Sequence, residues 1–142
     1  MKYLIYEKDG KLIIKTNSSC MSIIQSRNNI EFMIRKNVPK GSPYLWLDEK
    51  ELPNRRYQTA WKFDESKTSV VIDEKKAVKI ARQYALYALE QFAFMKFRDA
   101  AGIPIAMSPK ENEEYEEKKR KIQNCDSRGL LGKIETGFRG LT

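Results

Sequence analysis

The sequence contains no histidine and only two cysteines among its 142 residues. Without histidine, the chain lacks the usual general base near neutral pH, the partner of the common serine and cysteine nucleophiles, and the commonest zinc ligand. Cys20 and Cys125 can form at most one disulfide bond, and neither belongs to a Cys-x-x-Cys pair. We therefore expect two reduced thiols in a reducing compartment, no enzymatic activity, no cofactor and no metal site.

The chain also lacks an apolar run long enough to cross a membrane. Its longest such stretch, residues 84–97, is interrupted by Glu90, Gln91 and Lys96, whereas a spanning helix needs roughly twenty apolar residues. Hydrophobic residues still make up 41% of the sequence, which is within the range of globular proteins. We expect a folded chain without a membrane span.

The chain carries an excess of positive charge. The 27 lysines and arginines outnumber the 19 acidic residues, which gives a net charge of +8. A surface of this sign attracts nucleic acid or an acidic protein at low salt, but net charge says little about fold or specificity. No basic arm or acidic tail stands out, so the charge alone does not locate a binding site.

The first half of the chain has the pattern of a small antiparallel sheet. Residues 3–6 and 12–14 are rich in aromatic and β-branched side chains, and Asp9-Gly10 between them is a strong hairpin signal. Residues 18–29 fit either a helical turn or a strand, and we interpret them as a short helix. Further strands are predicted at Ile30, Phe32 and Ile34, at residues 44–47 and at residues 68–72.

A long helix is predicted to begin after Asp73, whose carboxylate can accept hydrogen bonds from first-turn amides, and to run to about Asp99. Its apolar residues cover most of the circumference, so one stripe against a sheet would not bury them all. The helix is therefore either central in the fold or also a surface for an oligomer or a partner. A second helix is predicted from Ser108, because a first-turn proline and Glu111 follow this capping serine.

The last segment of the chain changes in character. Four of the seven glycines, Gly129, Gly132, Gly137 and Gly140, are interleaved there with large apolar residues. Such a segment is too flexible to be a good autonomous helix and too apolar to be an inert linker, so we expect a docking tail ordered by a neighbour. The run from Gly129 to Lys133 is not a phosphate-binding loop, because its glycines are too close together and isoleucine follows the lysine.

Together these patterns predict an α+β protein whose N-terminal hairpin and small antiparallel sheet pack on the long helix. We expect a core domain over residues 1–104, a charged helix over 105–124 and a flexible docking tail over 125–142. The expected partner contacts are Tyr87, Phe94, Phe97, Tyr115, Leu130, Leu131 and Phe138.

A basic and aromatic segment provides a candidate nucleic-acid contact. Arg55, Arg56 and Lys62 alternate with aromatic residues at 57, 61 and 63. This combination is typical of single-stranded nucleic-acid grooves, where bases stack and phosphates pair with cations. The competing interpretation is a folded segment with Trp61 in the core and the arginines at its rim.

An acidic cluster is formed by Asp48, Glu49 and Glu51. Carboxylates of this kind can bind Mg²⁺ or act as acid and base. The simpler interpretation is a charged turn, because one local run rarely supplies the converging ligands of a metal site.

A distinctive order of short motifs runs through about residues 1–95. The motifs are Val38-Pro39, Gly41, Pro43-Tyr44, Asp48, Leu52-Pro53, Arg56, Ala60-Trp61, Asp73 and Lys76-Ala77. This order resembles small uncharacterised proteins encoded in the tail regions of tailed bacteriophages and prophages. The family has no settled activity, so the resemblance implies a virion or virion-assembly component without a catalytic site, in the virion or the host cytoplasm. The charged helix and the glycine-rich tail differ from the short helical endings of that family.

The leading hypothesis is a non-catalytic, tail-associated structural or assembly protein that acts through protein–protein contacts in an oligomer. The alternative is a basic nucleic-acid-binding or host-inhibitor protein of the same origin. Salt-dependent binding to DNA or RNA that is lost on changing Arg55 and Arg56 would favour this alternative. An enzyme using the carboxylates near Asp48 is the third hypothesis.

Overall fold

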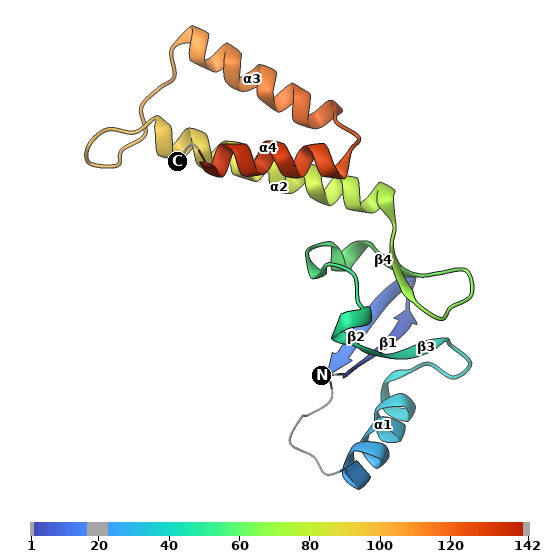
Figure 1. Cartoon of the computed structure of the whole chain (residues 1–142). Helices are drawn as coiled ribbons and strands as arrows, with labels where there is room; N and C mark the ends of the chain where they lie inside the picture. Colours follow the sequence, from blue (N-terminus) through green and yellow to red (C-terminus); the bar gives the residue numbers. More distant parts are fainter. Residues whose placement is uncertain (1, 17–22, 141–142) are drawn as a thin grey trace. The chain divides into compact units, whose positions relative to one another are not determined.

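The computed structural model describes residues 2–16 and 23–140 (Figure 1), and it confirms the α+β class. The chain forms two compact units, Met1–Asp73 and Glu74–Thr142. We expected a core domain over residues 1–104, so the observed boundary differs from the expected one. It groups the long helix with the C-terminal helices and separates it from the sheet.

The first unit is built around a three-stranded antiparallel sheet in the order β2-β1-β3. The strands are β1 (Lys2–Lys8), β2 (Lys11–Thr16) and β3 (Tyr44–Asp48). Ile5 of the central strand is paired with Ile14 on one side and Leu45 on the other. The turn between β1 and β2 has positive φ at Asp9 (55°) and Gly10 (75°), which is the geometry that Asp-Gly favours. The predicted hairpin is confirmed.

A second sheet completes the core of this unit. It pairs β4 (Trp61–Phe63) with β5 (Val70–Ile72) in antiparallel fashion. Tyr3 and Ile5 of β1 pack in one cluster with Trp61 and Val70. Leu4 and Tyr6 point to the opposite face of the same strand and are also buried, so β1 is covered on both sides.

Helix α1 (Ile23–Asn37) occupies the region where we predicted a strand. The prediction from Ile30, Phe32 and Ile34 is therefore wrong. Ile30 and Ile34 are half-buried, one helical turn apart, whereas Phe32 is exposed. Ile30 and Ile34 therefore lie on the inner side of the helix and Phe32 on the outer side, so the alternation of apolar residues did not reflect a strand. In Figure 1, α1 lies below the three-stranded sheet and β4 lies above it.

Two short 3-10 turns connect β3 to β4. They are η1 (Glu49–Glu51) and η2 (Arg55–Ala60). Trp61 directly after η2 is buried, and its indole N–H donates to the backbone oxygen of Asn54 at 3.3 Å. This segment is therefore fastened to the core of the first unit.

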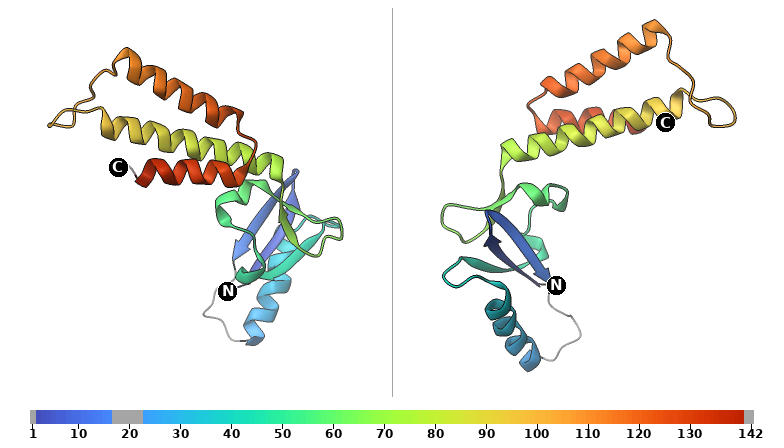
Figure 2. Two further views of the ribbon diagram at one scale, coloured as in Figure 1. Left: turned by 45° about the horizontal axis from the view of Figure 1, so that its top comes forward. Right: turned by 180° about the vertical axis from the view of Figure 1, so that it is seen from behind.

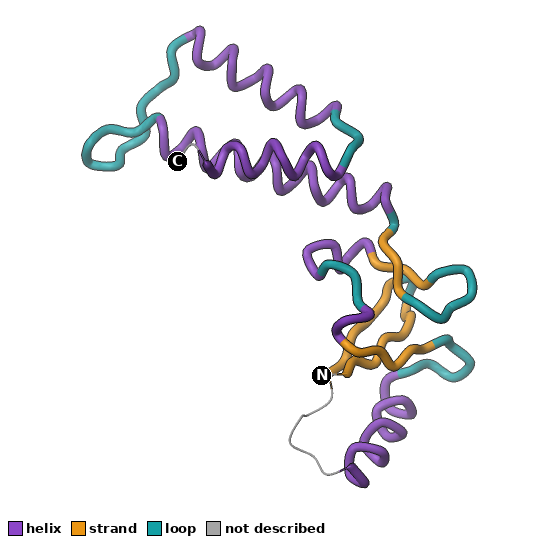
Figure 3. The backbone as a smooth tube through the Cα atoms, viewed as in Figure 1, coloured by secondary structure: helices purple, strands orange, loops and turns teal. Residues whose placement is uncertain are grey.

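The second unit consists of three helices and their connections (Figure 3). These are α2 (Glu74–Lys96), α3 (Pro109–Asn124) and α4 (Arg128–Gly140). Both views in Figure 2 show α4 beside α2. The helices run parallel, because their starts meet through Arg128 and Glu74 and their later turns meet through Phe138 and Phe92. Within the described ranges, no helix has the length and hydropathy to cross a bilayer.

Both predicted helix starts in this unit are confirmed. Helix α2 begins directly after Asp73, although it ends at Lys96, earlier than expected. At the start of α3 the amide of Glu111 donates to the Ser108 hydroxyl at 3.2 Å, and the amide of Ser108 donates to the Glu111 carboxylate at 3.1 Å. The bond from the Ser108 amide also lowers the pKa of Glu111.

The flexible docking tail predicted for residues 125–142 is corrected by α4. Leu131, Glu135 and Phe138 recur at four- and three-residue intervals and are all buried, so one face of the helix packs within the unit. Ser127 supports the first turn, because its hydroxyl accepts a hydrogen bond from the amide of Leu130 at 3.3 Å. The neighbour that orders this segment is α2 of the same chain.

Candidate interaction surface on the helical unit

Helix α2 uses one face to close the helical unit. Ala77, Ala81, Ala85 and Ala88 recur at intervals of three or four residues and are buried. Because their side chains are short, the backbone of a neighbouring helix can approach closely. The α2–α4 pair is the most extensively packed helix pair in the unit. This alanine face is therefore core.

A second face of α2 is exposed. We call it the exposed stripe. Its residues follow one another at alternating intervals of four and three, which is the spacing of helices that pack along their length. Its two most open aromatic side chains, Tyr87 and Phe94, are 60% and 50% exposed. The stripe consists of Ile80, which is half-buried, and the exposed residues Tyr84, Tyr87, Gln91 and Phe94.

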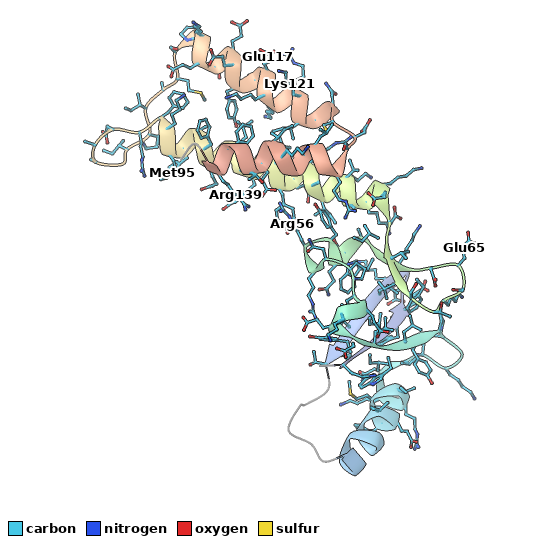
Figure 4. The ribbon with its side chains drawn as sticks, viewed as in Figure 1. Arg56, Glu65, Met95, Glu117, Lys121 and Arg139 are labelled. Carbon is cyan, nitrogen blue, oxygen red and sulfur yellow. The ribbon has the colours of Figure 1, made fainter. Side chains whose placement is uncertain are left out.

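The loop after α2 presents further apolar side chains. Its conformation is fixed by Asp99, whose carboxylate accepts hydrogen bonds from the amides of Ala101 and Ile103 at 2.9 Å each. Ile103 and Ile105 nevertheless remain exposed, as does Met95 at the end of the helix (Figure 4). Ile103 and Ile105 were not among the predicted contact residues. Two isoleucines flanking a proline directly after Gly102 were the available signal.

Some of the predicted contact residues are exposed, whereas others are buried within the chain. Tyr87, Phe94 and Leu130 are exposed and available for contact. Leu131 and Phe138 are 1% and 7% exposed. For these two, the predicted partner contact is corrected to a contact within the chain, because they form the inner face of α4.

Phe97 and Tyr115 are half-buried and line a cavity of about 20 Å³ between α2 and α3. Desolvation raises the pKa of Tyr115, and the negative charges of Glu90 and Glu116 raise it further. These two residues therefore belong mainly to the α2–α3 packing.

Lys118 links all three helices. Its ammonium lies 5.6 Å from the centroid of the Phe92 ring and 5.8 Å from that of Phe138, and the two rings stack 6.0 Å apart. A cation over aromatic faces stabilises such a cluster. The charged helix α3 thus contributes one of its lysines to the closure of the unit.

Two aromatic rings of the predicted nucleic-acid segment are buried, so they offer no surface on which bases could stack. Tyr57 and Trp61 are buried, and the Arg55 guanidinium lies over the ring of Tyr3 at 4.5 Å. Arg56 belongs to η2 and Lys62 is exposed on β4. Arg55 and Lys62 are exposed and Arg56 is half-buried, whereas the two large aromatic rings are part of the core.

The acidic cluster forms a local turn. The carboxylate of Asp48 accepts from the amide of Glu49 at 2.8 Å, and that of Glu51 accepts from the amide of Asp48 at 2.8 Å. Within residues 2–16 and 23–140, no three acidic or cysteine side chains are grouped to hold a metal ion. In the described part of the chain, these carboxylates cap η1.

The two cysteines differ in what the structure describes. Cys125 is half-buried in the α3–α4 connection, where its thiol lies 3.7 Å from the backbone oxygen of Ser127. Cys20 falls outside the described residues. The prediction of reduced thiols stays a prediction.

Comparison with known proteins adds no relative. No family model matches the chain, and no curated protein or solved structure matches it. The surfaces described above are therefore the basis on which a function can be proposed.

Proposed function

We propose that this chain is a non-catalytic structural or assembly protein that binds other proteins through the exposed stripe of α2. The observation that carries the proposal is a helix with two apolar faces, of which only the alanine face is filled by the rest of the unit. The resemblance of residues 1–95 to phage tail-region proteins suggests the setting, a tail-associated virion component or assembly factor.

Burial of the exposed aromatic side chains of the stripe would contribute substantially to the free energy of binding. Tyr87 and Phe94 are 60% and 50% exposed. Covering them would remove roughly 200 Å² of apolar surface, on the order of 5 kcal/mol before the costs of association. A stable interface usually buries about 1,200–2,000 Å² in total, so these residues would form the centre of a larger contact. Aromatic residues at the centre of an interface commonly carry most of the binding energy.

The spacing of the stripe indicates the form of the partner. Side chains at alternating intervals of four and three lie in a nearly straight row along a helix. A second helix can place its own apolar row against such a row. We therefore expect an amphipathic helix of another virion or assembly protein, or of a second copy.

The test is the double variant Tyr87→Ser/Phe94→Ser in the phage or prophage that carries the gene. We expect the variant to be at least tenfold depleted from purified particles, or from the assembly intermediate that contains the wild-type chain, as quantified by mass spectrometry. Size-exclusion chromatography with light scattering would show whether self-association is also lost.

The matched control is Phe32→Ser/Tyr44→Ser, which removes two exposed aromatic rings from the first unit. Circular dichroism of both proteins checks that they fold. The proposal fails if a folded Tyr87→Ser/Phe94→Ser protein enters particles at the wild-type level, or if the control is depleted equally.

A further inference from the structure

An open groove lies at the start of α2, on a different face from the exposed stripe. Its volume is about 420 Å³. Lys75, Lys79 and Arg82 recur at intervals of four and three, so they share one side of the helix. With them, the groove is lined by Glu74, Val78 and Asp126.

The two acidic residues of the groove are already engaged. Glu74 accepts a hydrogen bond from Arg128 at 2.9 Å, and Asp126 pairs with Arg82. Within the described part of the chain, neither Lys75 nor Lys79 has an acidic partner. The groove therefore has two uncompensated ammonium groups.

Further positive charge gathers at the same end of the helical unit. Arg82 Nε donates to the backbone oxygen of Cys125 at 3.0 Å, so the last turn of α3 lies beside this part of α2. That end of α3 carries Arg120, which is exposed, and Lys121, which pairs with Glu117 at 3.8 Å. The N-termini of α2 and α4 also meet here through Glu74 and Arg128, and each helix start adds a partial positive charge.

We propose that this groove binds the phosphate backbone of duplex nucleic acid, as a site separate from the exposed stripe. The distance along the helix from residue 75 to 82 is about 10 Å at about 1.5 Å per residue, which corresponds to roughly three phosphates of one strand at about 3.4 Å each. A row of cations of this length suits a polyanion better than a single small anion.

The lining of the groove favours backbone contacts over base contacts. Among the described residues that line the groove, Val78 is the only apolar one and none is aromatic. Recognition of single strands depends largely on stacking of bases on aromatic side chains, and the groove offers no such surface. Binding should therefore be independent of sequence and stronger for a duplex than for a single strand of equal charge.

The test measures binding of the full chain to a fluorescent duplex of about 20 bp by polarisation. With about three phosphates contacted, the affinity should fall about 40-fold between about 50 and 200 mM salt. The variant Lys75→Gln/Lys79→Gln should bind at least fivefold more weakly at the lower salt concentration, and its log–log salt slope should be shallower by about 2.

The matched control is Arg55→Gln/Lys62→Gln, which removes the same two charges from the first unit. It should bind almost as well as the wild type. The proposal would be overturned by an absence of duplex binding at about 50 mM salt, by equal weakening of both variants, or by competition from polyglutamate as strong as that from DNA of equal charge. A single strand of equal charge that binds more tightly than the duplex would also overturn it.

Discussion

Asp64 organises the connection between β4 and β5. One carboxylate oxygen accepts hydrogen bonds from the amides of Thr68 and Ser69 at 2.9 and 3.2 Å. The other accepts from the hydroxyls of Ser66 and Ser69 at 2.9 Å each. Desolvation raises the pKa of Asp64, but these hydrogen bonds together outweigh it and lower the pKa from 3.8 to about 2. The ionised carboxylate is therefore part of the folded connection.

This arrangement predicts a pH-dependent effect of Asp64→Asn. Because the folded-state pKa is lowered, the stabilisation is fully present above about pH 4 and is lost as the pH falls through about 2. The variant should melt at a lower temperature than the wild type at pH 7, and the difference should shrink between about pH 4 and pH 2. Calorimetric melting curves at several pH values check this.

Glu65→Gln is the control, because Glu65 is exposed and points away from the connection (Figure 4). It should leave the melting temperature nearly unchanged. A difference between wild type and Asp64→Asn that stays constant down to pH 2 would contradict the role given to the carboxylate.

At the scale of the elements, two adjacent leucines of α4 allow a direct test of how this helix packs. Leu130 and Leu131 are neighbours in sequence, but Leu130 is 55% exposed and Leu131 is 1% exposed. Leu131→Ala should lower the free energy of unfolding by about 2–5 kcal/mol, because it leaves a cavity against α2. Leu130→Ala should change it by less than about 0.5 kcal/mol. Urea unfolding followed by circular dichroism measures both, and equal effects would refute the packing of α4.

How far an element could be predicted from sequence depended on whether its signal was local. The Asp9-Gly10 hairpin and the Ser108 cap were predictable, because neighbouring residues form each by themselves. The strand predicted over Ile30–Ile34 was wrong, because Ile30 and Ile34 are also one helical turn apart, while Phe32 lies on the exposed side. The Glu31–Arg35 ion pair at 3.9 Å and Pro39 after the helix were the overlooked helical signals.

Helix α4 escaped prediction for a different reason. Glycine disfavours a helix by about 1 kcal/mol per residue relative to alanine, and this segment has several glycines. Burial of Leu131 and Phe138 against α2 compensates for that cost, which local composition does not reveal. Ser127, a suitable N-cap residue, lies just before this segment, and it was the available signal for a helix start.

The candidate surface was predictable only in part. The sequence indicated that α2 has too many apolar residues for one stripe, and Tyr87 and Phe94 are indeed exposed. It could not indicate that the alanine face, rather than the aromatic one, is covered, because that depends on where α4 packs. Leu131 and Phe138 were assigned to a partner for the same reason.

On the scale of the whole molecule, the chain is two compact units with separate cores. The first contains the sheets and the second contains α2, α3 and α4. Because α4 supplies part of the second core, deletion of residues 126–142 should destabilise the helical unit.

Because the two units have separate cores, we expect a destabilising substitution in one unit to leave the stability of the other unchanged. Leu131→Ala should accelerate hydrogen exchange of the buried amides of α2 and α3, because it promotes opening of the helical unit. Exchange in β1 and its neighbours should remain at the wild-type rate. Mass spectrometry of deuterated peptides checks this, and acceleration of similar size in both units would show that they unfold as one.

Three faces of α2 have a structural role or a proposed binding role, and this limits which of its positions can change during evolution. The alanine face closes the unit, the exposed stripe is proposed to meet a protein, and the groove is proposed to meet phosphates. Few positions serve none of these purposes, and Gln83 and Glu90, both exposed, are among them. In a set of descendants, substitutions should accumulate at these two positions, while most of the helix drifts more slowly than the sheet unit.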